Sequence, residues 1–286
     1  MFIAALILVL LSGSMHAVWN LMTKKSLNKT VFLWSIHIVA GIILFPSFIY
    51  ELTQIGLTAT LLGFLALSFC FQAGYLVFLS KTYSYGEMSQ VYPLMRGIGA
   101  LLVPIASTFV YQESLSLMGW FGLTLIIVGL FFISDIHRGT KNQSTNSRKK
   151  LAILFAVLVG CCITGYTLVD KHLVGHFSPF AIIEISNISY IVISTRYVLR
   201  SKKLKQEWQR NWRTILVGSF FSPGSYILFL FAMSLAPLAS IAPIREVGTV
   251  FGTLLGVLIL KESHGARRIA FSAVITCGII TIALWR

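Results

Sequence analysis

The stretch Val91-Tyr92-Pro93-Leu94-Met95-Arg96-Gly97 lies in an apolar run, and Ile241-Ala242-Pro243-Ile244-Arg245-Glu246 resembles it 149 residues later, counted between the two arginines. Each stretch places an arginine about two turns into a helix that is otherwise apolar enough to lie in lipid. A guanidinium at that depth costs at least about 2.5–3.5 kcal/mol on insertion scales, so it needs water or an anionic partner. Two such arginines, one in each half of the chain, predict a shared central site.

Composition sets the class of protein. Hydrophobic residues make up 56% of the chain, charged residues 11%, and the mean hydropathy is +0.83. The apolar runs repeatedly reach about 20 residues, the length that crosses a bilayer as a helix. Backbone groups in lipid must be paired internally, and the alternation of a membrane β-barrel is missing from the sequence. The fold class is therefore all-α, a polytopic membrane protein.

We expect ten transmembrane helices. Their predicted ranges are 2–21, 31–50, 58–80, 89–111, 117–134, 151–169, 178–199, 213–235, 238–260 and 265–285.

A polar, basic stretch divides these helices into two sets of five. Residues 137–150 have no apolar periodicity and are predicted to be a linker. The two predicted domains are residues 1–136 and residues 151–286, each a five-helix repeat. Because five is odd, the second repeat enters the membrane from the opposite side, which makes the repeat inverted.

Rare residues align between the two halves, as an internal duplication requires. At an offset of 149 the aligned pairs include Arg96 with Arg245, Glu113 with Glu262 and Gly129 with Gly278, and at an offset of 147 they include Gly13 with Gly160 and Lys24 with Lys171.

The formal net charge of +14 would suggest a nucleic-acid partner in a soluble protein. Here Lys and Arg lie almost wholly in the short connections, and chiefly in those that follow odd-numbered helices. That distribution reports topology, so no nucleic-acid partner is expected. By the positive-inside rule the basic connections are cytoplasmic, which predicts a bacterial inner (plasma) membrane protein with both termini outside the cytoplasm.

Neither metal nor cofactor chemistry is expected. The four cysteines fall in apolar segments without metal-ligand spacing, and His172 with His176 lacks a third ligand. The sequence also lacks the G-x-S-x-G, H-E-x-x-H and Walker motifs, so we do not expect an enzyme.

These features together resemble the drug/metabolite transporter superfamily, in its ten-helix EamA type. The resemblance rests on the two five-helix halves, on Glu113 and Glu262 near the ends of the fourth and ninth helices, and on His16-Ala17-Val18-Trp19-Asn20 with Lys24 beyond. It implies a transporter of small metabolites, often outward. Such members are expected to keep both termini inside, so the predicted orientation departs from the family pattern.

Arg96 and Arg245 allow two interpretations, a substrate-binding or gating role and a structural ion pair. Glu246 follows Arg245 directly, and adjacent helical residues do not face each other. Glu184, in the seventh predicted helix, is a candidate partner. It lies three residues before Asn187 on the same face, and a buried carboxyl there is also a candidate for proton coupling.

The first helix carries His16 and Asn20 on one face with Trp19 beside them, and Tyr166 occupies the matching part of the sixth. These side chains could contact a substrate, or they could anchor at interfaces and bond neighbouring helices. His37 and Gln72 are predicted to form helix-to-helix bonds. The full predicted substrate-binding set is Arg96, Arg245, Glu246, Tyr92, His16, Trp19, Asn20, Tyr166, Glu184, Asn187 and Tyr226.

Small residues predict where helices touch and bend. Gly248, Gly252 and Gly256 recur every fourth residue, which favours close packing against the fourth helix over a homodimer contact, so both a monomer and a homodimer stay open. Pro223-Gly224 is the best hinge candidate, although a static kink is an equal alternative.

We therefore predict a secondary transporter that moves a small organic anion or zwitterion by alternating access. The expected cargo is amino-acid-like, an organic acid, or a metabolite bearing phosphate or phosphonate, with membrane lipids as the other partner. A channel would be expected to show a pore-lining ring or filter. A flippase for a lipid-linked anionic head group is the alternative.

Overall fold

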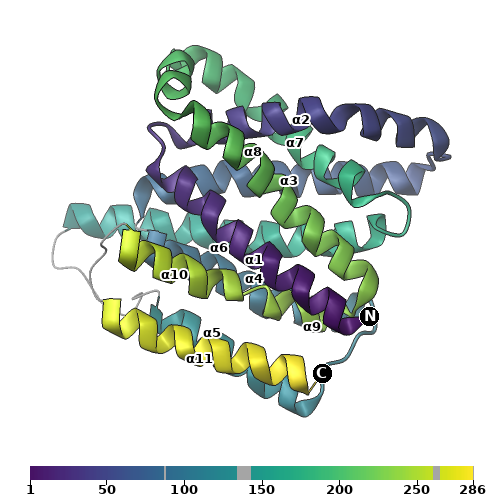
Figure 1. Ribbon diagram of the computed structural model, residues 1–286, viewed down its shortest axis with the longest axis vertical. Helices are drawn as coiled ribbons and strands as arrows, with labels where there is room; N and C mark the ends of the chain where they lie inside the picture. Colours follow the sequence, from purple (N-terminus) through teal and green to yellow (C-terminus); the bar gives the residue numbers. More distant parts are fainter. Residues whose placement is uncertain (87, 134–142, 260–264, 286) are drawn as a thin grey trace.

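The computed structural model describes residues 1–86, 88–133, 143–259 and 265–285, and all its regular elements there are helices (Figure 1). They are α1 (Phe2–Lys25), α2 (Lys29–Gln54), α3 (Ala59–Tyr85), α4 (Met88–Val110), α5 (Leu117–Ile133), α6 (Gln143–Leu173), α7 (Pro179–Ser201), α8 (Leu204–Leu235), α9 (Leu238–Ile244), α10 (Val247–Ile259) and α11 (Gly265–Leu284).

The prediction of an all-α, ten-helix membrane protein is confirmed. Within the described residues, seven segments are long and apolar enough to span a membrane, and α9 with α10 forms one of them, Leu238–Ile259. Three shorter apolar segments, Leu94–Val110, Leu117–Phe132 and Ile269–Leu284, complete the set. Glu262 and Arg286 lie outside the described residues.

The ninth predicted helix is broken at Arg245 and Glu246, between α9 and α10. Pro243 has no N–H to donate, and the next N–H groups bond to carbonyls only three residues earlier: Glu246 to Pro243 at 3.0 Å and Thr249 to Glu246 at 2.8 Å. Such a tightened turn inside a helix often marks a functional hinge.

Two other elements differ from prediction. The described part of the predicted linker, residues 143–150, is helical and begins α6. In α8 the non-helical backbone lies at Asn211, which the sequence did not indicate, while Pro223 lies inside the helix, and a hinge at Pro223-Gly224 stays a prediction. At this end of α8, Glu207 accepts from the Asn28 N–H at 2.7 Å and from Asn211 Nδ2 at 2.5 Å, so it joins the start of α8 to the start of α2.

The two sets of helices are interlaced in a symmetric pattern. α1 packs along α8 as α3 packs along α6, and α2 against α7 and α5 against α11 pair equivalent helices. α1 and α6 run in opposite directions (Figure 1), as an inverted repeat requires. The core therefore lies between helices drawn from both sets.

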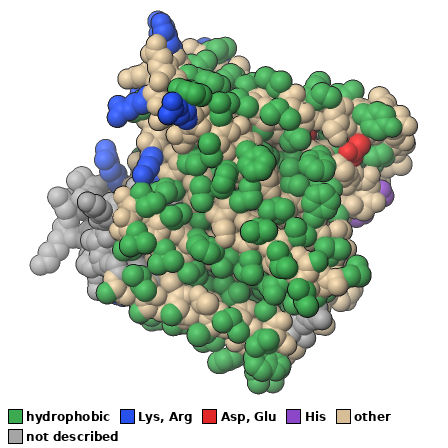
Figure 2. All heavy atoms as spheres, viewed as in Figure 1, with side chains coloured by type: hydrophobic (Ala, Val, Ile, Leu, Met, Phe, Trp, Pro, Cys, Tyr) green, Lys and Arg blue, Asp and Glu red, His purple; other side chains and the backbone are tan. Residues whose placement is uncertain are grey.

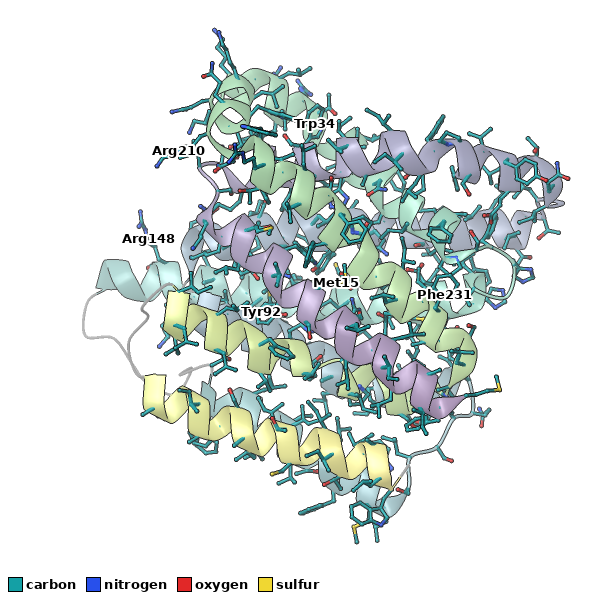
Figure 3. All side chains as sticks on the ribbon, in the orientation of Figure 1. Met15, Trp34, Tyr92, Arg148, Arg210 and Phe231 are labelled. Atoms are coloured by element: carbon teal, nitrogen blue, oxygen red, sulfur yellow. The ribbon has the colours of Figure 1, made fainter. Side chains whose placement is uncertain are left out.

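The surface is that of a chain in lipid. Hydrophobic side chains cover the middle of the face in Figure 2, and large ones such as Phe109 and Phe220 are 76% and 70% exposed. Lys and Arg side chains gather at one edge of that view, where Arg148 and Arg210 project (Figure 3), while both termini lie at the opposite edge (Figure 1).

Close backbone contact joins α1 and α10 at the break. A Cβ added at Gly248 would lie 2.6 Å from the carbonyl oxygen of Gly13, and one added at Gly13 would lie 2.9 Å from that of Arg245. Gly252 instead faces the ring of Tyr92 on α4. The predicted packing against the fourth helix therefore holds for Gly252, whereas Gly248 faces α1.

Gly248→Ala should lower the melting temperature of the purified protein, because its new methyl group meets rigid backbone and overpacking costs about 1–3 kcal/mol. Gly63→Ala is the matched control, since nothing lies within 4 Å of a Cβ there. Equal melting temperatures for the two variants, measured by fluorescence in detergent, would contradict the close contact.

Candidate functional site

Arg96 is paired across the two halves of the chain. Its Nη2 lies 2.7 Å from Glu246 Oε1, and its Nε donates to Glu246 Oε2 at 3.3 Å. The two side chains are 5% and 2% exposed, and Thr249 Oγ1 donates to the same carboxylate at 3.0 Å. A two-point contact of this kind fixes geometry as well as charge. The ion-pair interpretation is therefore confirmed for Arg96, with Glu246 and not Glu184 as its partner.

Arg245 is buried without such a partner. Its Nε donates to Ser12 Oγ at 3.0 Å, and its guanidinium carbon lies 4.3 Å from the ring centre of Phe229 and 5.4 Å from that of Tyr226. In the part of the chain that the structure describes, no carboxylate is within ion-pair distance of Arg245. Aromatic faces attract a cation but leave its N–H groups free to donate.

Both arginines border enclosed space. A central cavity of about 30 Å³ is lined by Arg245 with four other predicted residues, His16, Trp19, Tyr166 and Tyr226. A second cavity of about 10 Å³ is lined by Arg96, Arg245 and Glu246, among others. The two arginines therefore line one small cavity together, while Arg245 alone of the pair lines the central one. Since about 30 Å³ is the volume of one water molecule, this conformation is closed to any organic solute.

The central cavity has an unpaired hydrogen-bond donor. Trp19 Nε1 and His37 Nε2 are both buried without a partner among the described residues, and both side chains line the cavity. Because His37 Nδ1 donates to Asn187 Oδ1, His37 Nε2 is an acceptor in the neutral ring, and the unpaired donor is Trp19 Nε1. Tyr166 lies edge-on to Tyr75 and Tyr226, with ring centres 5.6 and 5.4 Å apart. Buried polar groups ordinarily find partners, so the unpaired indole N–H of Trp19, on the same cavity as the Arg245 guanidinium, suits a ligand that accepts hydrogen bonds.

Six predicted residues do not line the central cavity: Arg96 and Glu246, which line the second cavity, and Asn20, Tyr92, Glu184 and Asn187. Asn20 donates to the carbonyl of His16 at 2.7 Å and accepts from the Tyr83 hydroxyl at 2.7 Å, which is the helix-bonding alternative. Tyr92 stacks on His16 with ring centres 6.3 Å apart, and its buried hydroxyl has no partner in the described residues. Glu184 accepts from Asn187 at 2.7 Å.

The predicted helix-to-helix bonds of His37 and Gln72 are confirmed. His37 Nδ1 lies 2.8 Å from Asn187 Oδ1, which joins α2 to α7, and Gln72 Nε2 donates to Asp170 at 3.0 Å, which joins α3 to α6. Both side chains also line the central cavity, which the sequence did not indicate.

Comparison with known proteins places this geometry in a family. The sequence model of the EamA-like transporter family matches residues 150–284, and that of the Small Multidrug Resistance protein family matches residues 52–126. The chain belongs to the drug/metabolite transporter superfamily and is of the EamA type.

Named relatives of this EamA-type chain come from several bacteria. A putative sugar uptake protein of Listeria monocytogenes is 24% identical over 186 residues, 64% of this chain and 63% of that protein. A probable 4-amino-4-deoxy-L-arabinose-phosphoundecaprenol flippase subunit, ArnE of Hamiltonella defensa, is 31% identical over 71 residues, 25% of this chain and 63% of that protein. The multidrug resistance protein EbrB of Bacillus subtilis is 35% identical over 69 residues, 23% of this chain and 59% of EbrB. The chain thus spans about three fifths of each relative's length.

A solved crystal structure shares the fold of this chain over its whole length. The TM-score is 0.69 at 13% identity, and the superposition covers 100% of this chain and 98% of the other.

One buried charge of the protein was not predicted from the sequence. Asp170 in α6 is 0% exposed and accepts from Ser68 Oγ at 2.6 Å, Gln72 Nε2 at 3.0 Å and the Tyr226 hydroxyl at 2.6 Å. Because it follows the predicted end of the sixth helix and precedes Lys171, its sequence context is that of a helix terminus. The signal that could have found it is the face that it shares with Tyr166, four residues earlier.

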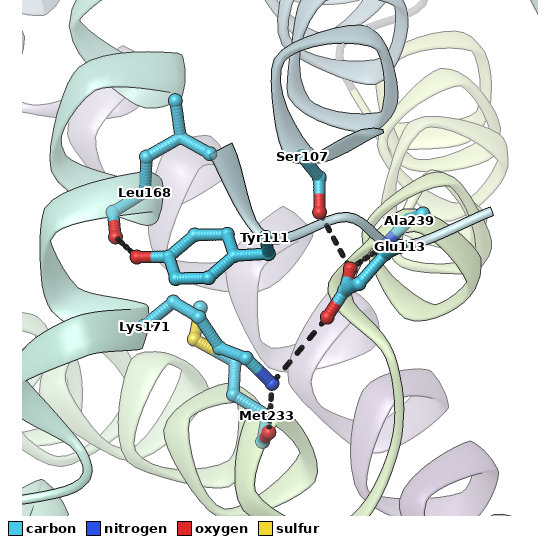
Figure 4. Close-up of polar contacts among 7 residues, drawn as sticks. All are labelled: Ser107, Tyr111, Glu113, Leu168, Lys171, Met233 and Ala239. Carbon is cyan, nitrogen blue, oxygen red and sulfur yellow. Dashed lines mark hydrogen bonds and ion pairs between the residues drawn. The ribbon is translucent and has the colours of Figure 1, made fainter. Parts of the chain in front are cut away.

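Equivalent lysines join helix ends at the two ends of the molecule. Lys171 Nζ donates to the carbonyl of Met233 at 2.7 Å and lies 3.8 Å from Glu113 (Figure 4). Lys24 Nζ, its counterpart in the repeat, donates to the carbonyls of Gly86 and Tyr83 at 2.7 and 3.2 Å. Each lysine joins the end of the first helix of its set to the end of the third.

The Lys171 end is held by further bonds. Glu113 also accepts from Ser107 Oγ at 2.5 Å and from the N–H of Ala239 at 2.8 Å, at the start of α9. The Tyr111 hydroxyl donates to the carbonyl of Leu168 at 2.5 Å. Burial and the nearby negative charge of Glu113 raise the pKa of Tyr111 to about 12. The Tyr111 hydroxyl therefore keeps its proton at physiological pH.

Breaking the buried ion pair on one side should be costlier than removing both charges. Glu246→Gln leaves the Arg96 guanidinium buried and unpaired, which costs about 3–5 kcal/mol, and Arg96→Gln/Glu246→Gln should cost less than the sum of the two single changes. Unfolding free energies from denaturant titration provide the measurement. Glu246→Gln combined with the exposed Arg196→Gln should be additive, and additivity in the Arg96 cycle as well would contradict the pairing.

Proposed function

We propose that the protein is a secondary transporter that moves a small organic anion or zwitterion by alternating access. The observation that carries this proposal is Arg245, a buried cation without a carboxylate partner among the described residues, at the wall of a small cavity that also holds the unpaired N–H of Trp19. An amino-acid-like molecule, an organic acid, or a phosphate or phosphonate would each supply the acceptor oxygens.

The side chains divide into binding and supporting roles. Arg245 holds the anionic group of the cargo through its free N–H donors, because a guanidinium presents several donors in a rigid plane. Trp19 and Tyr166 add one donor each from α1 and α6. Arg96 and Glu246 neutralise each other and hold the break between α9 and α10 in place beside Arg245.

Alternating access suits the closed shape of this conformation. The cavity must grow before an organic solute enters, and the lysine contacts at either end are the bonds to be broken. In transporters with inverted repeats, discontinuous helices at the repeat interface form the substrate site. The break at Arg245 and Glu246 has that position.

The test is thermal stabilisation of the purified protein by succinate, methylphosphonate, glutamate and glucose. An anion that binds the folded state raises the melting temperature, by the equivalent of about 2.7 kcal/mol at 100 times its Kd. The stabilisation should be lost in Arg245→Gln, partly kept in Arg245→Lys, and unchanged in the exposed Arg196→Gln. Stabilisation by glucose alone, or by the anions in Arg245→Gln, would contradict the proposal.

A flippase for a lipid-linked anionic head group is the second candidate. One relative is named as a flippase subunit, and an apolar groove of about 380 Å³ lies between α2 and α8, where lipid chains could rest. The same assay separates the two functions, because a flippase would be stabilised by an undecaprenyl-linked anion and not by the soluble anions.

We also propose that this multi-pass protein lies in the bacterial inner membrane with both termini outside the cytoplasm. The support is the concentration of Lys and Arg at the end opposite the termini (Figures 1 and 2).

A cysteine added after the C-terminus should therefore react with an impermeant maleimide in intact spheroplasts, whereas Lys202→Cys, in the connection between α7 and α8, should stay protected. The native cysteines are first replaced by alanine. The reverse labelling pattern would restore the orientation usual for the family.

A further inference from the structure

Asp170 is a buried carboxylate without a cation. Its three partners, Ser68, Gln72 and Tyr226, are all neutral donors, and within the described residues no lysine or arginine lies within ion-pair distance of it. Lys171, the next residue, points away toward Met233 and Glu113. An unpaired charge in the membrane interior is costly, so its presence calls for a function.

The repeat itself does not require this carboxylate. Lys24 and Lys171 are equivalent and make equivalent carbonyl contacts, so the residues before them, Thr23 and Asp170, are equivalent as well. Thr23 is also fully buried, but its hydroxyl donates to the carbonyl of Trp19 in its own helix at 2.9 Å. The fold is therefore built with a neutral residue in one half and an acid in the other.

Asp170 lies directly behind the wall of the central cavity. Two of its donors, Gln72 and Tyr226, line that cavity, and the ring of Tyr226 also faces the guanidinium of Arg245 at 5.4 Å. One residue further along α6, Lys171 closes the end of the molecule. Opening that end would bring water close to Asp170.

The charges around the cavity balance only when the site is empty. Arg96 and Arg245 carry two positive charges, and Glu246 and Asp170 carry two negative charges. A bound monoanion leaves one uncompensated negative charge in a space of low polarity, where such an excess is expensive. One proton on Asp170 removes it.

The surroundings of Asp170 can accommodate both of its forms. The Ser68 and Tyr226 hydroxyls donate to the carboxylate, and either can rotate to accept from the carboxylic acid. The other titratable or charged groups around it are Tyr166 and Lys171 on α6, Tyr111 just after α4, and Arg245 beyond Tyr226.

We propose that Asp170 is the proton-binding group that couples transport to the proton gradient, taking up one proton from water as a monoanion binds beside Arg245 and releasing it with that anion. This inference rests on the proposed function, because it assumes an anionic cargo. The step converts a carboxylate and a proton to a carboxylic acid, so cargo and proton cross together without net charge.

Glu184 is the competing carboxylate, and its surroundings suit the role less well. Its side-chain partner is Asn187, between α2 and α7, and neither of them lines the central cavity. Glu184→Gln is therefore the matched control.

The first experiment needs no ligand. Infrared titration of the full-length protein in lipid should show a carboxylic-acid carbonyl band that appears as the pH falls. The band should be missing in Asp170→Asn, kept in Glu184→Gln, and displaced in its titration by Tyr226→Phe, which removes one donor without removing the acid. A spectrum of Asp170→Asn identical to that of the wild type overturns the proposal. If Asp170→Asn does not fold, the titration of the band in Tyr226→Phe decides, and an unchanged titration overturns the proposal.

The second experiment measures coupling, with methanesulfonate as the probe because this anion does not itself titrate. In the wild type its affinity should rise as the pH is lowered, by up to about tenfold per pH unit, since one proton binds with each anion. The affinity should be high and independent of pH in Asp170→Asn, which mimics the neutral acid, and Glu184→Gln should behave as the wild type.

The outcomes separate the two proposals. Binding that depends on Arg245 but not on pH would overturn the coupling while the transporter proposal stands. A pH-dependent affinity that persists in Asp170→Asn would assign the proton elsewhere. Failure of methanesulfonate and of every anion of the thermal assay to bind would overturn the anionic cargo, and the coupling with it.

Discussion

The constraint on which this structure depends is the cost of holding charge inside a membrane. Arg96 offsets this cost by forming an ion pair with Glu246, which lies in the other half of the chain, at the break between α9 and α10. Since neither partner can leave without exposing the other, this contact fixes the two halves against each other at the centre. Arg245, next to Glu246, lies in the same break and faces serine and aromatic rings, which leaves its charge available to a ligand.

The donors around Arg245 give the site its chemical character. Indole and phenol groups supply N–H and O–H bonds from rigid rings, so little side-chain freedom is lost when they bind an acceptor. Two further helices, α2 and α3, contribute His37 and Gln72, whose other bonds tie them to α7 and α6. A change in the cavity would therefore alter the contacts between these helices. The proposed alternating access requires such a connection between the cavity and the helix packing.

Much of the fold could be predicted from the sequence, because apolar runs of membrane length and rare residues at a constant offset are local patterns. The partner of Arg96 could not, since it depends on which helices meet in space. The break at Arg245 and Glu246 was hidden because Pro243 lies where the first turns of a helix were expected. Asp170 was missed because a charged pair at the end of an apolar run is typical of a helix that leaves the membrane. Asn20 and Glu184 looked like site residues, yet their amide and carboxylate are engaged by neighbours.

The interlacing of the two sets of helices has a mechanical consequence. A helix moves with the neighbour along which it packs, and here α1 packs along α8 and α3 along α6, one from each repeat. In the alternating access proposed above, the bodies that tilt past each other are thus mixtures of both sets of helices, and the moving unit differs from the five-helix unit whose residues align in the sequence.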